Sequence, residues 1–303
     1  MSDQTETLDA IRSFNRSFTQ RLSLLSRNYL DSDLSVTEAR VLFEICTGPP
    51  ATAREFAIRL DIDEGYLSRL LNGFDNHGWI TRRRSQSDAR KQDISATEAG
   101  QNALAPLHDK SRADITRRLA GRDLKGIARS MNALNVQISG IDLAAVQLRG
   151  LGPGDAGWLI QHHAEHYAAS DGFDASFEAL VAEVLAEFLR SPNQMDRAWI
   201  AHSDSLRLGS IFCVQTDTPK VAQLRLFYLT PPARGLGLGQ RLLNACINHA
   251  RNHGNHTLKL WTHETHRAAT QLYKRSGFRM IASEPVHHFG QDCIQQNWEL
   301  PLN

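Results

Sequence analysis

Apolar residues in the first third of the chain recur mostly at helical spacing. One run covers residues 8–28, with Leu8, Ile11, Phe14 and Phe18 on a single face, and it predicts an amphipathic helix. Three shorter helical stretches follow, "SVTEARVLFEIC", "AREFAIRL" and "EGYLSRLLNGFDNHGWI". The last of these is expected to end near 73–78. Short helices joined by a tight turn predict a helix-turn-helix.

The starts of the first two short helices carry a capping signal. Ser35 with Glu38, and Thr52 with Glu55, have the spacing of a capping box. In this arrangement the hydroxyl accepts a hydrogen bond from one free amide, and the carboxylate reaches back to another. Both helix starts are therefore predicted at these residues.

A basic hairpin is predicted directly after the helix-turn-helix. In "GWITRRRSQSDARKQDISATEAG" two extended runs flank a polar tip. A hairpin beside a recognition helix is a wing, and its arginines suit the narrow, negatively charged minor groove of DNA. The alternative is an edge hairpin that its charge keeps soluble. The cations of this segment are Arg82, Arg83, Arg84, Arg90 and Lys91.

The wing sequence "DARKQDISAT" resembles that of MarR-like winged helix-turn-helix regulators, in which Asp-x-Arg is followed by Thr seven residues after the arginine. Asp88, Arg90 and Thr97 match this pattern, whereas Ala96 stands where the family usually has leucine. The resemblance covers about residues 5–140. It implies a homodimer whose two recognition helices read a pseudo-palindromic site on double-stranded DNA.

The same resemblance assigns roles to individual side chains. Arg90 would enter the minor groove, held by Asp88. The phosphate contacts, which position a protein without reading sequence, would come from Lys91 and the arginines at 82–84. The side chains assigned to the major groove are Ser68, Arg69 and Asn72. Residues 97–139 return to helical spacing and are interpreted as dimerisation helices and a tether, with the boundary in "ISGIDL" (138–143).

From residue 144 onward strands and helices alternate. A strand at 144–149 and helices near 154–169 and 174–190 precede the strands "RAWIAHS", "LRLGSIFCVQ" and "VAQLRLFYL". A helix from about Gly235, the strand "TLKLWTH", the helix "HRAATQLYKRS" and two final strands complete the series. The first of these helices is expected to place Leu238, Leu242, Cys246 and Ala250 in one row. This order of strands and helices predicts an α/β or α+β sheet domain. Two domains are therefore expected: a mainly helical one over 1–140 and a sheet-containing one over 144–303.

Three alternating glycines stand between a predicted strand and a predicted helix in "PPARGLGLGQRLL" (231–243). Glycine allows close approach to the main chain, whose amides and helix dipole favour an anion. A Walker loop would need Gly-Lys-Ser/Thr, which is absent, and a Rossmann fingerprint would need a small residue at Leu242. A purely structural turn is the remaining alternative.

This segment resembles the GNAT superfamily of N-acetyltransferases, whose motif Arg/Gln-x-x-Gly-x-Gly/Ala is met by Arg234, Gly237 and Gly239. A second segment, "AATQLYKRSGF", resembles the Ala-x-x-Leu-Tyr-x-x-x-Gly-Phe signature of that family. One departure is His266, where many members carry an asparagine that touches the cofactor. The resemblance implies that main-chain amides bind the diphosphate of acetyl-CoA and that the strand at 227–229 binds its pantetheine arm. The implied cofactor contacts are Phe227, Tyr228, Leu229, Arg234, Gly235, Leu236, Gly237, Leu238, Gly239, Gln240, His266 and Tyr273.

The implied reaction is attack of an amine on a thioester. A strand amide near Leu229 would stabilise the oxyanion, and Tyr273 would protonate the departing sulfur. For the base, Glu165, Glu178, His202 and a water relay remain open.

Arg225 is unusual because alternation places it on the same strand face as Val221, Gln223, Phe227 and Leu229. A charge on a largely buried face needs a partner. Either a carboxylate of the substrate or an internal Asp or Glu would serve.

Composition narrows these interpretations. A net charge of +1 with mixed charges is typical of a globular protein, and no apolar run approaches the ~18 residues of a membrane span. The four separated cysteines predict reduced thiols in a cytosolic protein. His249 and His253 are four residues apart, but a cationic helix end explains them, so no metal is expected.

The overall expectation is an acetyl-CoA-dependent N-acetyltransferase for a small amine or amino acid, joined to a dimeric DNA-binding regulator. Two alternatives remain. The second domain could be a ligand sensor without turnover, or the first could be only a dimerisation scaffold.

Overall fold

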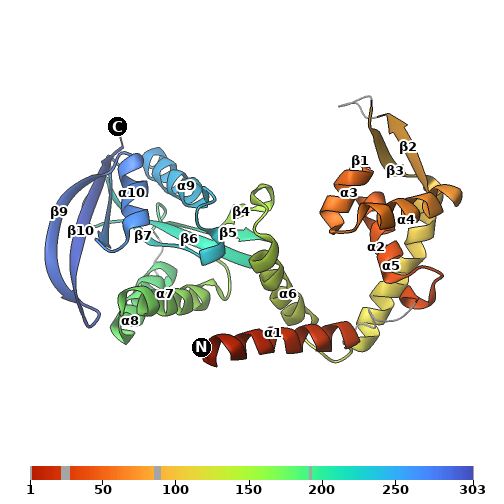
Figure 1. The fold of residues 1–303 in the computed structure, drawn as a ribbon. Coiled ribbons are helices and arrows are strands. Elements are labelled where there is room, and N and C mark those ends of the chain that lie inside the picture. The colour runs from red at the N-terminus through yellow and green to blue at the C-terminus, as the bar shows by residue number, and fades with distance from the viewer. Residues whose placement is uncertain (1, 22–27, 85–89, 191–192, 303) are drawn as a thin grey trace. The chain divides into compact units, whose positions relative to one another are not determined.

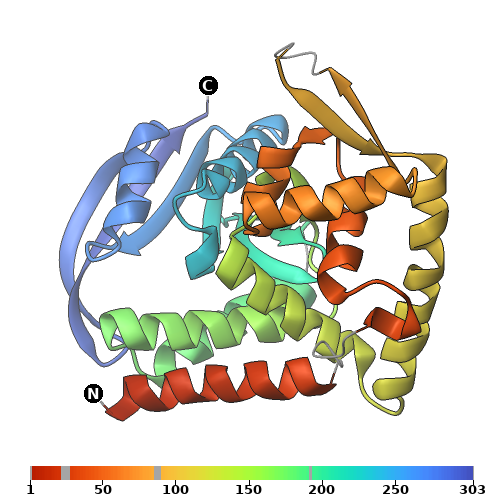
Figure 2. The same ribbon diagram turned by 45° about the vertical axis from the view of Figure 1, so that its right-hand side comes forward.

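The computed structural model describes residues 2–21, 28–84, 90–190 and 193–302. The chain divides into two compact units, Met1–Leu124 and Lys125–Asn303. Figures 1 and 2 show both from two directions, and each unit is described here by itself.

The first unit is mainly helical and carries a small sheet. Its strands lie in the order β1-β3-β2, and β2 pairs antiparallel with β3. The core between the helices and this sheet includes Phe56, Leu67 and Ile94. The elements are α1 (Ser2–Arg21), α2 (Val36–Thr47), β1 (Ala51–Thr52), α3 (Ala53–Leu60), α4 (Glu64–Asn76), β2 (Ile80–Arg84), β3 (Gln92–Ala96) and α5 (Glu98–Arg118).

The predicted helix starts are confirmed. The Ser35 and Thr52 side chains accept hydrogen bonds from the amides of Glu38 and Glu55. Each glutamate side chain in turn accepts a hydrogen bond from the amide of its cap residue. Helix α1 is described only to Arg21, so the rest of the expected helix over 8–28 lies outside the described residues.

The second unit contains a seven-stranded mixed sheet in the order β4-β5-β6-β7-β8-β10-β9. Neighbouring strands are antiparallel except for β7 and β8. The sheet elements are β4 (Gln147–Arg149), β5 (Arg197–Ser203), β6 (Leu206–Gln215), β7 (Val221–Leu229), β8 (Thr257–His263), β9 (Arg279–His288) and β10 (Gln291–Pro301). The helices are α6 (Leu124–Ser139), α7 (Asp155–Asp171), α8 (Ala175–Arg190), α9 (Leu238–Asn252) and α10 (Arg267–Arg275).

Two element boundaries differ from expectation. The strand predicted at 144–149 begins at Gln147, because residues 143–145 form a single 3₁₀ turn capped by Asp142. The helix predicted from Gly235 begins at Leu238, because Gly235 and Gly237 both have positive φ, which a helix does not accommodate.

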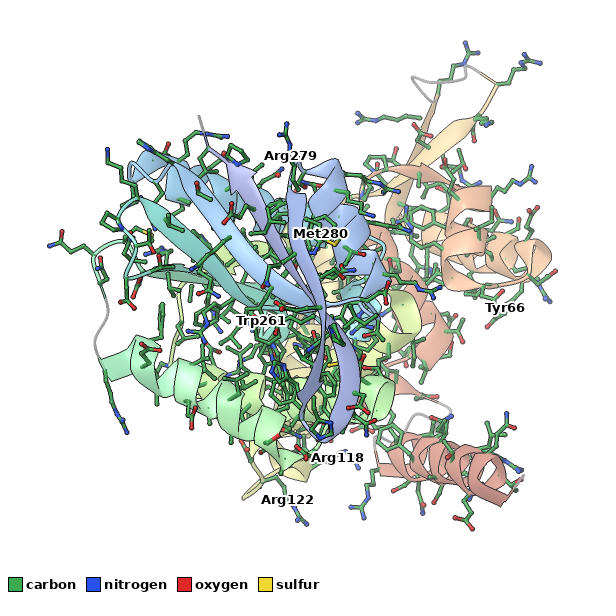
Figure 3. The ribbon with its side chains drawn as sticks, turned by 90° about the vertical axis from the view of Figure 1, so that its left-hand side faces the viewer. Tyr66, Arg118, Arg122, Trp261, Arg279 and Met280 are labelled. Atoms are coloured by element: carbon green, nitrogen blue, oxygen red, sulfur yellow. The ribbon has the colours of Figure 1, made fainter. Side chains whose placement is uncertain are left out.

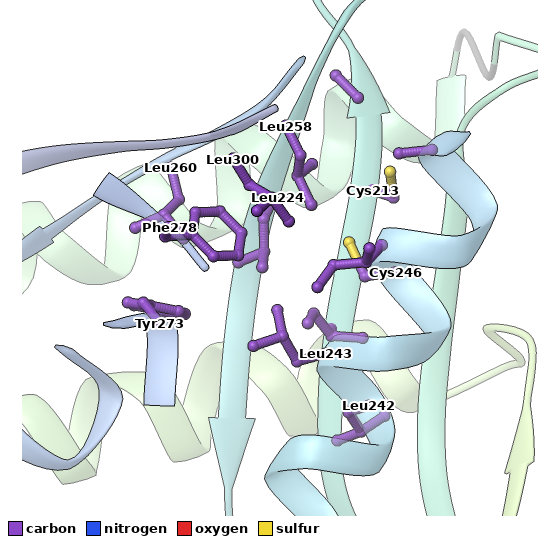
Figure 4. Packing of buried hydrophobic residues seen from close by; sticks show 14 of the residues in the cluster. Cys213, Leu224, Leu242, Leu243, Cys246, Leu258, Leu260, Tyr273, Phe278 and Leu300 are labelled. Carbon is purple, nitrogen blue, oxygen red and sulfur yellow. The ribbon is translucent and has the colours of Figure 1, made fainter. Parts of the chain in front are cut away.

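The sheet separates two cores. Helices α7 and α8 cover one face, where Leu159, Val181 and Phe212 belong to one cluster. Helix α9 covers the other face with the predicted row Leu238, Leu242, Cys246 and Ala250, all of them buried. Figure 4 shows part of this second cluster, including Leu224, Leu258 and Tyr273.

Strand β7 contains a bulge that changes the predicted face of Arg225. Ser210 pairs with Tyr228 and Phe212 with Arg225, so β7 has one residue more than β6 over this interval. Leu226 adopts a left-handed φ of 45° there. An extra residue flips the alternation, so Arg225 does not share the face of Phe227 and Leu229 as predicted. Those two pack on the α9 side together with Leu224.

The four cysteines are free thiols, two of them buried. No helix within the described residues has the length and apolar character needed to cross a membrane. The edge strand β9 is largely exposed, with Met280 49% exposed; Figure 3 labels it beside Arg279 and Trp261.

Candidate functional site

The glycine-rich loop after β7 leaves main chain exposed at a helix start. Gly235 and Gly237 have φ values of +75° and +80°, and a Cβ built on either would meet no atom within 4 Å. A Cβ on Gly239 would lie 3.3 Å from Leu229 and 3.4 Å from Leu272. Two of the alternating glycines therefore provide backbone geometry beside open space, and the third allows close packing.

Helix α9 begins immediately after this loop. Gly237 is its N-cap and supplies no side-chain cap, so the first amides of α9 have no partner within the helix. The Gln240 side chain turns away toward Asn244 and Ser276, 2.9 and 3.1 Å away. What the loop offers a ligand is therefore main-chain N–H groups at the positive end of a 15-residue helix.

The Arg234 side chain connects the glycine-rich loop to β7 and α7. Its Nε donates to the carbonyl oxygen of Leu229 at 3.1 Å, and its Nη2 lies 3.0 Å from Nε2 of His166 on α7. Burial lowers the pKa of His166, and the positive charge of Arg234 adds to the effect. A neutral imidazole here can accept the guanidinium hydrogen bond.

Strands β7 and β8 separate over the part of β7 that leads to the glycine-rich loop. They pair in parallel over residues 221–223 and 257–259, and both strands continue well beyond these pairs. A cavity of about 130 Å³ lies where they diverge. Its walls come from α7, α8, β7, β8 and α10. The lining residues used below are His163, Tyr167, Arg225, His263, His266 and Tyr273.

Tyr273 lines this cavity from α10 and is 4% exposed. Its ring lies 6.3 Å from that of Phe227 and 5.6 Å from that of Phe278. Burial raises the pKa of Tyr273 above its usual value. The phenol therefore keeps its proton at neutral pH, as a proton donor requires.

The carboxylates considered as bases lie elsewhere. Glu165 and Glu178 are exposed, and neither lines the cavity. Glu165 accepts a hydrogen bond from Gln161 at 2.9 Å. His202 lies on β5 with its Nδ1 3.2 Å from the carbonyl oxygen of Asp204. Of the described residues that line the cavity, none carries a carboxylate.

Arg225 also lines the cavity and meets an internal carboxylate only loosely. Its Nη1 lies 3.7 Å from Glu187, whose side chain is 77% exposed. Burial lowers the pKa of Arg225, while Glu187 acts in the opposite direction.

Histidines form much of the polar lining; the sequence analysis singled out His266 but not His163 or His263. Burial lowers the pKa of both His163 and His263 to about 4, so both are neutral at pH 7. His266 lies 3.1 Å from the Thr262 hydroxyl and 3.4 Å from Asp171. Burial lowers its pKa, although Asp171 opposes the shift.

A buried ion cluster fixes the start of α7, and sequence reasoning missed it. Asp155 is fully buried. It accepts from Arg149 at 2.5 and 3.0 Å, from Arg207 at 2.6 Å and from the Gly152 amide at 2.6 Å. Against the cost of its burial, these donors lower the pKa of Asp155 to about 2. An acidic residue just after the Gly-Pro-Gly turn was the available signal.

The candidate DNA surface lies on α4 and the wing. Ser68, Arg69 and Asn72 are all exposed on α4. Arg69 stacks its guanidinium 5.6 Å from the ring of Tyr66, which Figure 3 labels on this helix. Thr97 is the N-cap of α5 and donates to the carbonyl oxygen of Gly78 at 2.6 Å. Thr97 thereby links the end of the wing to the end of α4.

The wing cations differ in their surroundings. Arg82 Nη2 donates to Asn72 at 3.1 Å, and its Nε lies 3.4 Å from Asp75, so this predicted phosphate contact also ties the wing to α4. Arg84, Arg90 and Lys91 are exposed. Asp88 lies outside the described residues.

No metal cluster is found within the described ranges: no three His, Cys, Asp or Glu side chains there are placed to hold an ion. His249 Nε2 instead lies 2.7 Å from the carbonyl oxygen of Met195, and His253 Nδ1 lies 2.8 Å from that of His249.

Comparisons with known proteins match each unit separately. Residues 161–278 match the sequence model described as acetyltransferase (GNAT) family, and residues 32–91 match that of the MarR family. An uncharacterized HTH-type transcriptional regulator of Bacillus cereus is 34% identical over 88 residues, which are 29% of this chain and 58% of the relative. An uncharacterized N-acetyltransferase of Methanocaldococcus jannaschii is 34% identical over 59 residues, 20% of this chain and 26% of that relative. This chain therefore spans little more than half of the first relative's length and about a quarter of the second's.

Among solved structures, a GCN5-related N-acetyltransferase from Kribbella flavida is 24% identical with a TM-score of 0.45; the match covers 53% of this chain and all of that chain. The fold and the family matches together define a two-domain protein. Its first domain is a winged helix-turn-helix that contains the segment similar to the MarR family, and its second has a mixed sheet and contains the segment similar to the GNAT acetyltransferase family.

Proposed function

We propose that the second domain transfers an acetyl group from acetyl-CoA to the primary amine of a small molecule, and that the first domain binds double-stranded DNA as a homodimer. The observation that carries the enzyme proposal is the exposed main chain at 235–237, which opens onto the start of α9. The cavity with the protonated Tyr273 lies where the adjoining strand diverges from β8.

The residues present fit coenzyme A. The main chain there is open to a ligand, because no atom beyond the adjoining residues lies within 4 Å of the Cβ position of Gly235 or Gly237. The amides of 238–240 would bind the diphosphate, and the unpaired edge of β7 would bind the pantetheine arm. When bound, acetyl-CoA supplies an activated thioester.

The chain's own groups would then do three things. A main-chain amide of β7 near Leu229 would stabilise negative charge on oxygen. Tyr273 holds a proton at its phenolic oxygen for the departing sulfur. The aromatic and aliphatic lining excludes water, which strengthens both interactions.

Two features support the proposed DNA-binding dimer. Exposed cations on the wing and exposed polar groups on α4 form a surface suited to phosphates and base edges. Helices α1 and α6 also carry exposed apolar side chains, which a partner chain would cover. These are Leu8, Ile11 and Phe14 on α1, and Met131, Leu134 and Ile138 on α6.

One observation favours a second candidate, a sensor that binds acetyl-CoA without turnover. The described cavity lining has no carboxylate to act as base. Release of CoA thiol, measured with the full chain, acetyl-CoA and a panel of primary amines, separates the two proposals. Amine-dependent release supports the enzyme. Tight acetyl-CoA binding by calorimetry without release for any amine supports the sensor, and absence of binding overturns both.

The DNA proposal is tested on the gene's own promoter by binding at several salt concentrations. The Arg90→Ala variant should bind this promoter DNA less tightly than the wild-type chain does. Unchanged affinity would leave the first domain with a scaffold role.

A further inference from the structure

The cavity between β7 and β8 contains a buried acceptor atom that the described chain does not satisfy. His163 is 3% exposed, and its Nδ1 lies 2.9 Å from the carbonyl oxygen of Leu159. Because a carbonyl only accepts, Nδ1 carries the ring proton and Nε2 presents a lone pair. Within the described residues Nε2 has no hydrogen-bond partner. A buried unsatisfied acceptor is unfavourable, so this position calls for a ligand donor.

A second polar group in the same lining is cationic. Arg225 is, among the described residues that line the cavity, the one with a permanent positive charge. Its contact with Glu187 is long, and that carboxylate is mostly in solvent, so the pair is weak. A guanidinium in this position can take a carboxylate with two parallel hydrogen bonds.

The wall that α8 contributes to the cavity is apolar. Phe177, Leu180, Val181 and Val184 line it from α8. This wall offers no hydrogen bonds and suits a hydrocarbon or aromatic group.

Resting on the proposed acetyl transfer, we propose that the acceptor is an amino acid with an apolar side chain. His163 Nε2 accepts a hydrogen bond from its amine, Arg225 binds its carboxylate, and α8 packs on its side chain. The neutral imidazole matters because a protonated ring would repel an incoming amine cation and could not accept its hydrogen. Burial, which lowers the pKa of His163 to about 4, keeps the ring neutral at pH 7.

The first arm of the test compares acceptors that differ only by the carboxylate. The pairs are leucine with isoamylamine, phenylalanine with phenethylamine, and methionine with 3-(methylthio)propylamine, each assayed for acetylation by the full chain. At least one amino acid should exceed its decarboxylated partner in kcat/KM by roughly tenfold or more, the effect of losing hydrogen bonds to a charged group. Arg225→Gln should bring that ratio close to one without changing KM for acetyl-CoA.

The second arm tests His163 against a matched neighbour. His162 lies on the same helix with Nδ1 3.0 Å from the Trp158 carbonyl oxygen, but it does not line the cavity. His163→Phe should raise KM for the preferred amino acid by about tenfold, while His162→Phe should not. His163→Gln, which keeps an acceptor, should recover part of the loss. Calorimetry with CoA reports whether each variant is folded, and if His163→Phe fails this check, His163→Gln and Arg225→Gln carry the test.

The outcomes separate this inference from the proposed function. Equal kcat/KM within every pair, or an acid preference that survives Arg225→Gln, overturns the amino acid assignment while leaving acetyl transfer intact. Acetylation confined to amines without carboxylates overturns it in the same way. If acetyl-CoA binds and neither these six compounds nor a wider amine panel is acetylated, the proposed enzyme activity itself falls.

Discussion

Two regions of this molecule are built for recognition by opposite means. The loop at 234–239 presents main chain, with two glycines in left-handed conformations beside open space. The wing presents side chains, with arginines along β2, further cations just before β3, and no unusual backbone in its described part. The first region depends on the absence of side chains, and the second depends on their charge.

The two kinds of site differ in how many other structural roles their residues can have. A left-handed glycine at a helix start has few roles other than a turn or an anion site. A surface arginine has many, and Arg82 is engaged by Asn72 and Asp75 of its own domain. Substitutions of single side chains should therefore differ widely in their effect on stability or binding, and the largest effect should come from removing a buried charge. The predictions below test this, from the largest expected effect to the smallest.

The largest effect is expected at Asp155, where two arginines surround one fully buried carboxylate. Asp155→Asn removes the negative charge but leaves both guanidinium groups in place. Removing one partner of a buried pair typically lowers stability by about 3–5 kcal/mol. Denaturant unfolding followed by tryptophan fluorescence, to which Trp158 contributes 6.0 Å from Arg207, measures this loss.

The pH dependence gives an independent check on Asp155. Its pKa is about 2 in the folded protein and 3.8 ordinarily, so its stabilisation is complete above pH 4 and is lost as pH falls toward 2. Asp155→Asn should lack this part of the acid sensitivity. Asp217→Asn, at an exposed position after β6, is the control. Equal stability of the two variants would contradict the role given to the cluster.

The next largest effect is expected at Tyr273, a side chain that lines the cavity from α10. Tyr273→Phe keeps the ring that packs near Phe227 and Phe278 and removes the phenolic proton. A positioned acid contributes typically ~10²–10⁴-fold, so kcat for acetyl transfer should fall by about 100-fold or more. The dissociation constant for CoA should change much less than kcat. An unchanged kcat would remove Tyr273 from the reaction.

Main-chain recognition is tested directly by two glycines with similar geometry. Gly237 and Gly254 have φ of +80° and +75°, and at both a Cβ would lie in open space. Alanine at either position should cost about 1–2 kcal/mol in backbone strain. Only Gly237→Ala alters the amides at the start of α9, so it alone should weaken CoA binding, by roughly 30-fold. Similar CoA affinity in both variants, measured by calorimetry, would contradict a main-chain site.

The same contrast explains how much of the structure the sequence could predict. Helix starts at Ser35 and Thr52, and the buried row from Leu238 to Ala250, follow from local spacing and are confirmed. The glycine loop was found because its geometry requires glycine. The bulge at Leu226 was not predicted, since neither glycine nor proline marks it. That single extra residue moved Arg225 to the other face of its strand.

Local sequence patterns could not predict which residues of α7 line the cavity. Whether Glu165 or His163 faces the sheet depends on how α7 packs on it, and residues two positions apart on a helix face different directions. The sequence analysis proposed Glu165, whereas the structure places His163 in the lining and Glu165 at the surface. Partner choice is equally nonlocal for Arg82, whose contacts lie on α4.

The smallest effect is expected within the wing and concerns the salt dependence of DNA binding. Arg84 is exposed, whereas Arg82 is held by Asn72 and Asp75. If Arg84 meets a phosphate, Arg84→Ala should reduce the slope of log K against log salt by about 0.9 per protomer. Arg82→Ala should weaken binding to the same promoter DNA by loosening the wing from α4, with little change in slope, because Asp75 already offsets its charge. Equal slope changes for the two variants would show that Arg82 leaves α4 to bind phosphate, and the contrast between engaged and available cations in the wing would not hold.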